Sequence, residues 1–130
     1  MKEFLYKIPP YLPTAIVLAL LFYLTLVPDP LPRIEQPFLH VDKLAHVAMM
    51  LVVSLIYTFD YTRRERQHKL SLPVSLWIFL ITVALGGFIE LAQGTELVNR
   101  GCDIWDFVAD SLGSVIAFAI SRPLMRVIFS

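Results

Sequence analysis

A chain of 130 residues is long enough for one domain, and its composition is that of a membrane protein. Hydrophobic residues make up 57% of it and charged residues only 17%, and the net charge of zero hides an uneven distribution along the chain. The single cysteine, Cys102, excludes an internal disulfide and a zinc site of paired cysteines, and no nucleic-acid signature is present. We therefore expect an all-α membrane bundle of four transmembrane helices, formed by a single domain over residues 1–130.

The first expected span covers residues 11–27. The basic start of the chain is interrupted by three prolines between residues 9 and 13, and proline suits the first turn of a helix. The apolar run that follows approaches the ~17 residues that a spanning helix needs. A cleaved signal peptide is the alternative, but the residues after Val27 lack the small-residue pair that cleavage prefers. An uncleaved span is the favoured interpretation.

The second span is expected over residues 42–59, after an irregular loop. Residues 28–40 contain four prolines, which favour extended, irregular backbone. Asp42 stands where it can cap the helix or complement its dipole from the first turn. His46 follows one turn later, so the two side chains should face the same way.

A short basic loop over residues 60–71 is expected to connect the second span to the third, which covers residues 73–94. A tight polar turn then leads to the fourth span, residues 103–121. Pro123 is expected to end that span, because proline inside a helix removes a backbone hydrogen bond. The tail of residues 122–130 is too short to span and is expected to lie at the membrane surface or to extend the helix.

Polar residues stand inside these apolar runs at helical spacing. Glu90 and Gln93 are three residues apart near the end of the third span and share a face. In the fourth span, one face about 80° wide holds three acids and three small residues: Asp103, Asp106, Asp110, Gly113, Ala117 and Ser121. An acid at the centre of a bilayer helix costs about 2.5–3.5 kcal/mol on insertion scales, so such residues should face protein or water. We expect the two helices to meet along this seam.

The distribution of lysine and arginine predicts the topology. With four spans, both termini and the 60–71 loop share one side, and that side carries eight of the eleven basic residues: Lys2, Lys7, Arg63, Arg64, Arg66, Lys69, Arg122 and Arg126. The other side carries Arg33, Lys43 and Arg100. By the positive-inside rule, both termini are expected in the cytoplasm.

The acids show the opposite bias and should line a polar pocket open to the outside. We expect His46, Glu90 and Asp42 to act in proton transfer, since a histidine among carboxylates is a workable acid–base set. The substrate-binding candidates are Arg100, Gln93, Lys43 and Asp110, with Arg100 suited to a phosphate or carboxylate. A divalent cation is a possible cofactor, and its candidate ligands are Asp103 and Asp106 together with Glu90 and His46. Oxygen-rich ligation suits Mg²⁺, Ca²⁺ or Mn²⁺, and the one histidine leaves zinc open.

A purely structural interpretation stands beside this one. Polar residues also hold membrane helices together. The same side chains could form packing pairs, namely Asp42–Lys43, Glu90–Arg100 and Asp106–Gln93.

The order of these residues resembles the VanZ-like family of small bacterial membrane proteins. The match lies in Asp42-Lys43-x-x-His46 opening one span, Glu90-x-x-Gln93 closing the next, Arg100 in the turn, and Asp103-x-x-Asp106 with Asp110 and Gly113 beyond. It extends over residues 28–121, and the family commonly has Asn at the position of Asp110. The resemblance implies a multi-pass protein of the bacterial inner (cytoplasmic) membrane. The family is named after an accessory factor of glycopeptide antibiotic resistance.

The expected function is to act on or bind a component of the cell envelope at the outer leaflet. The expected partners are membrane lipids and a lipid-linked phosphate precursor or a glycopeptide, and no nucleic acid is expected. A non-enzymatic binding or assembly module is one alternative. A small proton-coupled transport protein is another. The sequence leaves open whether the chain is an enzyme.

Overall fold

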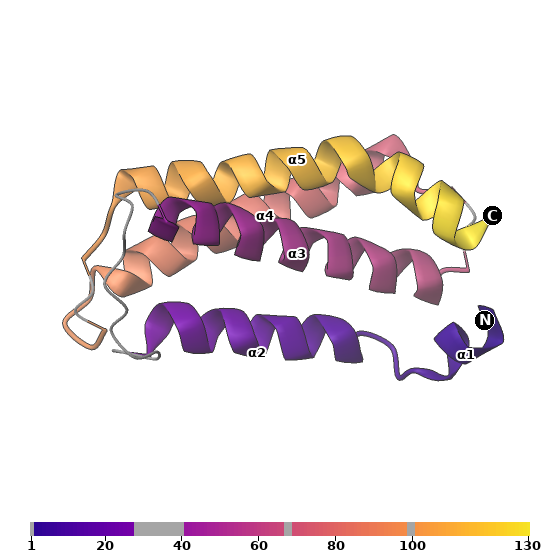
Figure 1. Ribbon diagram of the computed structural model, residues 1–130, viewed down its shortest axis with the longest axis horizontal. Helices are drawn as coiled ribbons and strands as arrows, with labels where there is room; N and C mark the ends of the chain where they lie inside the picture. The colour runs from indigo at the N-terminus through magenta and orange to yellow at the C-terminus, as the bar shows by residue number, and fades with distance from the viewer. Residues whose placement is uncertain (1, 28–40, 67–68, 99–100) are drawn as a thin grey trace.

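The computed structural model describes residues 2–27, 41–66, 69–98 and 101–130, and in these ranges it is all-helical. The elements are α1 (Lys2–Lys7), α2 (Leu12–Leu26), α3 (Val41–Arg64), α4 (Leu72–Gln93) and α5 (Ile104–Phe129). The four longer helices run alternately in opposite directions along one axis (Figure 1). As a result α1 and the end of α5 lie at one end of the bundle, and the start of α3 lies at the other.

Three of the helices are long and apolar enough to cross a membrane. They are α3, α4 and α5, with 24, 22 and 26 residues. The fourth, α2, is apolar but has only 15 residues, which is short of the ~17 that a full crossing needs. Large apolar side chains on the outside of the bundle suit a lipid environment, among them Ile16, Trp77, Leu80, Phe88, Leu112 and Val115. The expected all-helical architecture is thus confirmed, and three helices of full spanning length with one shorter apolar helix are compatible with a membrane bundle.

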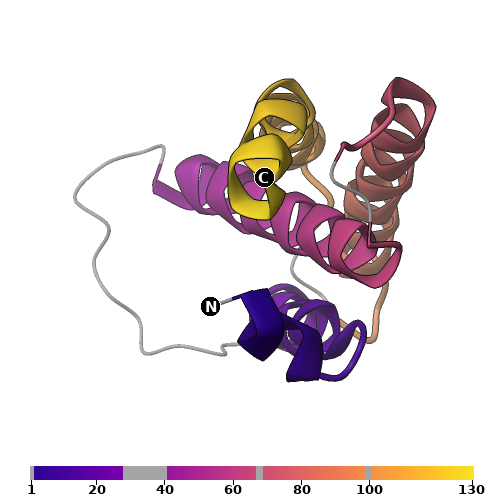
Figure 2. The same ribbon diagram turned by 90° about the vertical axis from the view of Figure 1, so that its right-hand side faces the viewer.

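The central element is α3, which contacts α1, α2, α4 and α5. Seen along the bundle, α3 lies between α2 on one side and α5 on the other, with α4 beside α3 and α5 (Figure 2). The buried apolar core joins three helices through Leu21, Met50, Val53 and Ile89. Every side chain that α3 turns inward therefore meets a neighbouring helix.

At Gly113 the backbones of α3 and α5 approach each other closely. A methyl group added there would lie 2.4 Å from the Val47 carbonyl oxygen and 3.0 Å from the Leu51 backbone nitrogen. Small residues let membrane helices pack backbone to backbone in this way. Farther along the same face of α5, Ala117 and Ser121 are also buried. The predicted seam of small residues is confirmed, and its partner is α3 as well as α4.

The prediction that Pro123 ends the last helix is wrong. Pro123 lies inside α5, which continues to Phe129. Met125 and Phe129 beyond it are buried, and the Phe129 ring stacks on Phe59 with 5.6 Å between the centroids. Packing of this last segment on α3 outweighs the hydrogen bond that proline removes, a balance often seen in membrane helices.

A second departure from expectation is at Asp60, which was assigned to the basic loop but lies inside α3 and is fully buried. One carboxylate oxygen accepts hydrogen bonds from the Thr14 backbone N–H (2.9 Å) and hydroxyl (2.6 Å). The other accepts one from the Arg63 guanidinium at 2.8 Å. Arg63 also donates to the carbonyl oxygens of Leu5 (2.9 Å) and Pro9 (3.1 Å). These bonds fasten α1 and the start of α2 to α3.

Candidate functional site

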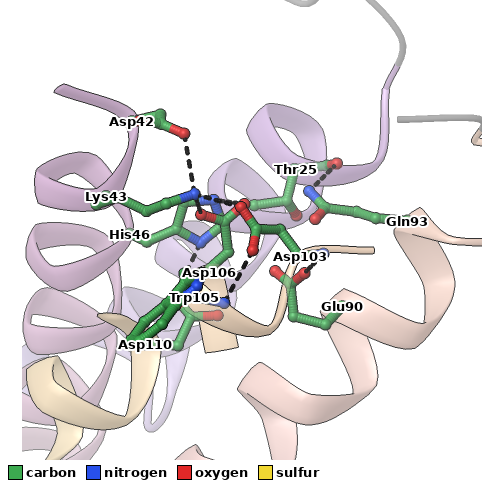
Figure 3. A network of polar contacts seen from close by, with 10 residues as sticks. All are labelled: Thr25, Asp42, Lys43, His46, Glu90, Gln93, Asp103, Trp105, Asp106 and Asp110. Carbon is green, nitrogen blue, oxygen red and sulfur yellow. Dashed lines mark hydrogen bonds and ion pairs between the residues drawn. The ribbon is translucent and has the colours of Figure 1, made fainter. Parts of the chain in front are cut away.

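A cluster of charged side chains lies at the end of the bundle where α3 and α5 begin and α4 ends (Figure 3). We refer to it as the polar cluster, and its members are Asp42, Lys43, His46, Glu90, Asp103, Asp106 and Asp110. Three helices that are distant in sequence contribute to it. The predicted meeting of these residues is therefore present in the fold.

Lys43 forms ion pairs with three carboxylates in the outer part of the polar cluster. Its ammonium group is 2.6 Å from a carboxylate oxygen of Asp103, 3.2 Å from one of Asp42, and also donates to Asp106. The two acids expected to bind a cation, Asp103 and Asp106, thus share the positive charge of this lysine. Lys43 thereby joins the first turn of α3 to the first turn of α5.

Asp103 also explains why α5 begins where it does. It is the N-cap of the helix, and its side chain accepts a hydrogen bond from the Trp105 backbone N–H at 2.9 Å. The Lys43 ammonium, together with this N–H, lowers the pKa of Asp103 below its usual range. Asp103 is consequently a carboxylate at neutral pH.

His46 lies deeper and is 8% exposed. Its Nδ1 is 3.0 Å from Oδ1 of Asp110, and its Nε2 is 3.7 Å from Oδ2 of Asp106. These two acids are one turn apart on α5, so they flank the ring from one side. A histidine held between two carboxylates is suited to accept and return a proton.

Glu90 approaches the same histidine from α4. It is 3% exposed, and its Oε2 accepts a hydrogen bond from the Asp103 backbone N–H at 3.1 Å. Donor atoms of His46, Glu90 and Asp110 lie within 4.8 Å of one another, close enough to hold a metal ion. In the described part of the chain, Oε1 of Glu90 and Oδ2 of Asp110 have no hydrogen-bond partner.

Gly86 allows this approach of α4. A methyl group at position 86 would lie 2.9 Å from Cβ of Asp110 and 3.2 Å from its Oδ2. Only hydrogen at this position leaves room for the Asp110 carboxylate beside α4. Gly86, one turn before Glu90 on α4, therefore shapes the space around Asp110.

The structure places one predicted substrate-binding residue, Gln93, outside the polar cluster. The Gln93 amide donates to the Thr25 carbonyl oxygen at 2.9 Å, so it links α4 to the end of α2 (Figure 3). The expected pairing of Gln93 with Asp106 gives way to this bond. Arg100, and with it the expected Glu90–Arg100 pair, lies outside the described residues. Lys43 pairs with Asp42 as expected, although both are on α3.

An apolar groove of about 500 Å³ runs beside the polar cluster, between α4 and α5. Its walls are Ala84, Gly87, Phe88, Glu90, Leu91, Cys102, Ile104 and Phe107. Glu90 belongs both to the groove and to the polar cluster. Helical periodicity could not reveal this groove, because its walls come from two helices whose relative rotation is set by packing.

The arrangement combines acid–base groups, candidate metal ligands and an adjacent apolar surface. No family model, curated protein or solved structure matches the chain. The functional argument consequently depends on the geometry described above.

Proposed function

We propose that the chain is a VanZ-like membrane protein that binds a lipid-linked component of the cell envelope. In this proposal the hydrocarbon chain of the ligand lies in the α4–α5 groove and its polar group meets the polar cluster. The observation that carries the proposal is the position of Glu90, a buried acid that is shared by the groove and the cluster.

The groove has the properties of a lipid-binding surface. Phe88, Leu91 and Ile104 are largely exposed on helices long enough to span a membrane, so they would face acyl chains. The volume falls within the range of ~300–1,000 Å³ that is usual for small-molecule sites. A ligand that enters from the bilayer would reach Glu90 without crossing the bundle.

The polar cluster supplies chemistry for the other end of the ligand. His46 beside Asp110 is a candidate general base for a hydroxyl or phosphate group. Lys43 offers a positive charge, although three carboxylates already share it. We infer a role in turnover for His46 and Glu90 and a positioning role for Lys43 and Asp103.

The charges of the described residues favour an orientation with the polar cluster outside the cell. The opposite end carries the basic residues Lys7, Arg63, Arg64, Arg66, Lys69, Arg122 and Arg126, while the cluster end carries Lys43. This distribution follows the positive-inside rule for cytoplasmic termini. The ligand would then be an outer-leaflet lipid carrying a wall precursor.

The test is photo-crosslinking of a labelled polyprenyl phosphate to the full chain in nanodiscs. Gly87→Leu should fill the groove and abolish saturable labelling. Ala119→Leu, an exposed small residue elsewhere on α5, is the matched control and should leave labelling intact. Equal labelling of both variants would contradict the proposal.

Turnover separates an enzyme from a binding module. If the labelled lipid is converted, His46→Ala and Glu90→Gln should stop the conversion while labelling persists. Saturable labelling without conversion in the unaltered chain would identify a binding module. Labelling that is neither saturable nor reduced by Gly87→Leu would reject both.

A further inference from the structure

We propose that His46, Glu90 and Asp110 bind one divalent transition-metal ion, and that Zn²⁺ fits this donor set best. The expectation from sequence was a cation held by Glu90 and His46 together with two further acids, Asp103 and Asp106. The structure puts the Lys43 ammonium beside those two acids instead. The metal site proposed here is the deeper, buried trio.

The geometry of the three donors is the first argument. His46 Nδ1 and Asp110 Oδ1 are 3.0 Å apart, and one donor atom of each residue lies within 4.8 Å of the others. Bonds of about 2.0–2.2 Å to a tetrahedral ion place ligand atoms roughly 3.4 Å apart. A rotation of the Glu90 side chain would be enough to close the trio around an ion.

The unpartnered oxygens are a second, independent argument. Oε1 of Glu90 and Oδ2 of Asp110 are buried without a hydrogen-bond partner in the described part of the chain, and the two residues are 3% and 2% exposed. A buried polar oxygen without a partner carries the full desolvation penalty of that group. Both oxygens belong to carboxylates of the trio, and one bound ion would give each of these carboxylates a positive partner.

The charge balance of the polar cluster points the same way. Its five carboxylates are Asp42, Glu90, Asp103, Asp106 and Asp110, and its lysine contacts Asp42, Asp103 and Asp106. Among the residues that the structure describes, Glu90 and Asp110 share His46 as their common neighbour. A divalent cation would neutralise these two carboxylates while leaving the histidine neutral, the form in which imidazole binds metals.

The donor types select the ion. Mg²⁺ and Ca²⁺ favour shells made of oxygen, whereas imidazole nitrogen suits zinc and its neighbours. Three protein ligands leave a fourth tetrahedral position open, as in catalytic zinc sites. A carboxylate oxygen of Asp106 lies 3.7 Å from Nε2 of His46, the ring nitrogen that faces away from Asp110. Carboxylates beside the non-coordinating nitrogen of a metal-bound histidine orient the ring, and Asp106 is placed to do this.

The open position lies next to the α4–α5 groove, because Glu90 is common to both. An ion there could bind a phosphate oxygen that the acids alone would repel. This last step rests on the proposed function, whereas the metal site itself does not. The experiment therefore measures the metal first, without any lipid ligand.

The test is calorimetric titration of the purified, chelator-treated full chain in detergent with Zn²⁺, Mn²⁺ and Mg²⁺. One Zn²⁺ should bind per chain, and Mg²⁺ should bind at least about tenfold more weakly. Glu90→Gln and Asp110→Asn preserve side-chain shape, and each should weaken Zn²⁺ binding at least about tenfold. Glu96→Gln removes an exposed acid near the same end and should leave the affinity unchanged.

Co²⁺ loaded into the unaltered chain gives a readout that needs no variant. Strong visible absorption would report a site of low coordination number, and loss of this absorption in His46→Gln would identify the nitrogen ligand. The proposal is overturned if no saturable Zn²⁺ binding occurs, or if Glu96→Gln weakens it as much as Asp110→Asn. If the chain binds zinc but is not crosslinked to the lipid, only the proposed function is rejected. If it is crosslinked to the lipid but does not bind zinc, only the metal site is rejected.

Discussion

Substituting Gly113 with alanine gives the sharpest test of the helix packing that forms the site. The added methyl group would lie 2.4 Å from the Val47 carbonyl oxygen, a full ångström inside the 3.4 Å at which ordinary contact begins. The obstructing atom is backbone, so a rotamer change cannot relieve the clash. The two helices must move apart at a position directly next to His46.

The expected magnitude combines two opposing terms. Overpacking costs about 1–3 kcal/mol, and a backbone obstacle places Gly113→Ala near the upper end of that range. Alanine is the better helix former by about 1 kcal/mol, which offsets part of the cost. We expect a net loss of about 2 kcal/mol in the free energy of unfolding.

The measurement is reversible unfolding in mixed detergent micelles, followed by helical circular dichroism. Gly87→Ala is the matched control, because its methyl group would meet the Phe107 ring at an ordinary 3.4 Å. That variant should match or exceed the stability of the unaltered chain by up to about 1 kcal/mol. If Gly113→Ala is as stable as Gly87→Ala, the close packing of α3 on α5 is refuted.

Three further predictions concern other parts of the chain. Asp60→Asn leaves Arg63 buried without its counter-charge and should cost about 3–5 kcal/mol in the same unfolding assay; a loss of only about 0.5 kcal/mol would contradict this. Lys43 lowers the pKa of Asp103 below its ordinary value of 3.8. The Asp103 carboxylate therefore contributes its full stabilisation of the fold at pH values above 3.8, and this contribution is lost as the pH falls through the lowered pKa. Asp103→Asn should therefore flatten the acid limb of a stability–pH profile. Cys102, the one cysteine of the chain, is exposed and should react with a membrane-impermeant maleimide on intact cells; labelling only after lysis would reverse the proposed orientation.

The elements of the site that follow from helical periodicity were predictable from sequence. The spacing of Asp106, Asp110 and Gly113 assigned them to one face of α5, and that face is turned inward. The position of Asp42 and His46 at the start of a span likewise placed them at the right level. The spacing of polar and small residues thus predicts which face of a helix packs against its neighbours, and for α5 this prediction is correct.

The partners of these residues were not predictable in the same way. Helical periodicity does not give the rotation of one helix relative to another or the offset along their axes. These two quantities determine that the Gln93 amide donates to the Thr25 carbonyl oxygen instead of to Asp106. The burial of Asp60 does not follow from the sequence prediction, because that prediction begins the basic loop at this residue. Its spacing of three from Arg63 was the available indication of a buried pair.

The attachment of α2 has a consequence for how the bundle tolerates change. Thr14 near its start and Thr25 near its end are hydrogen-bonded to α3 and α4, whereas two apolar cavities of about 230 and 200 Å³ lie along the turns between. A helix that is hydrogen-bonded to its neighbours near both ends can bend in its middle. Substitutions that change side-chain size should accordingly be tolerated best beside the two cavities in the middle of α2, and least at Thr14 and Thr25.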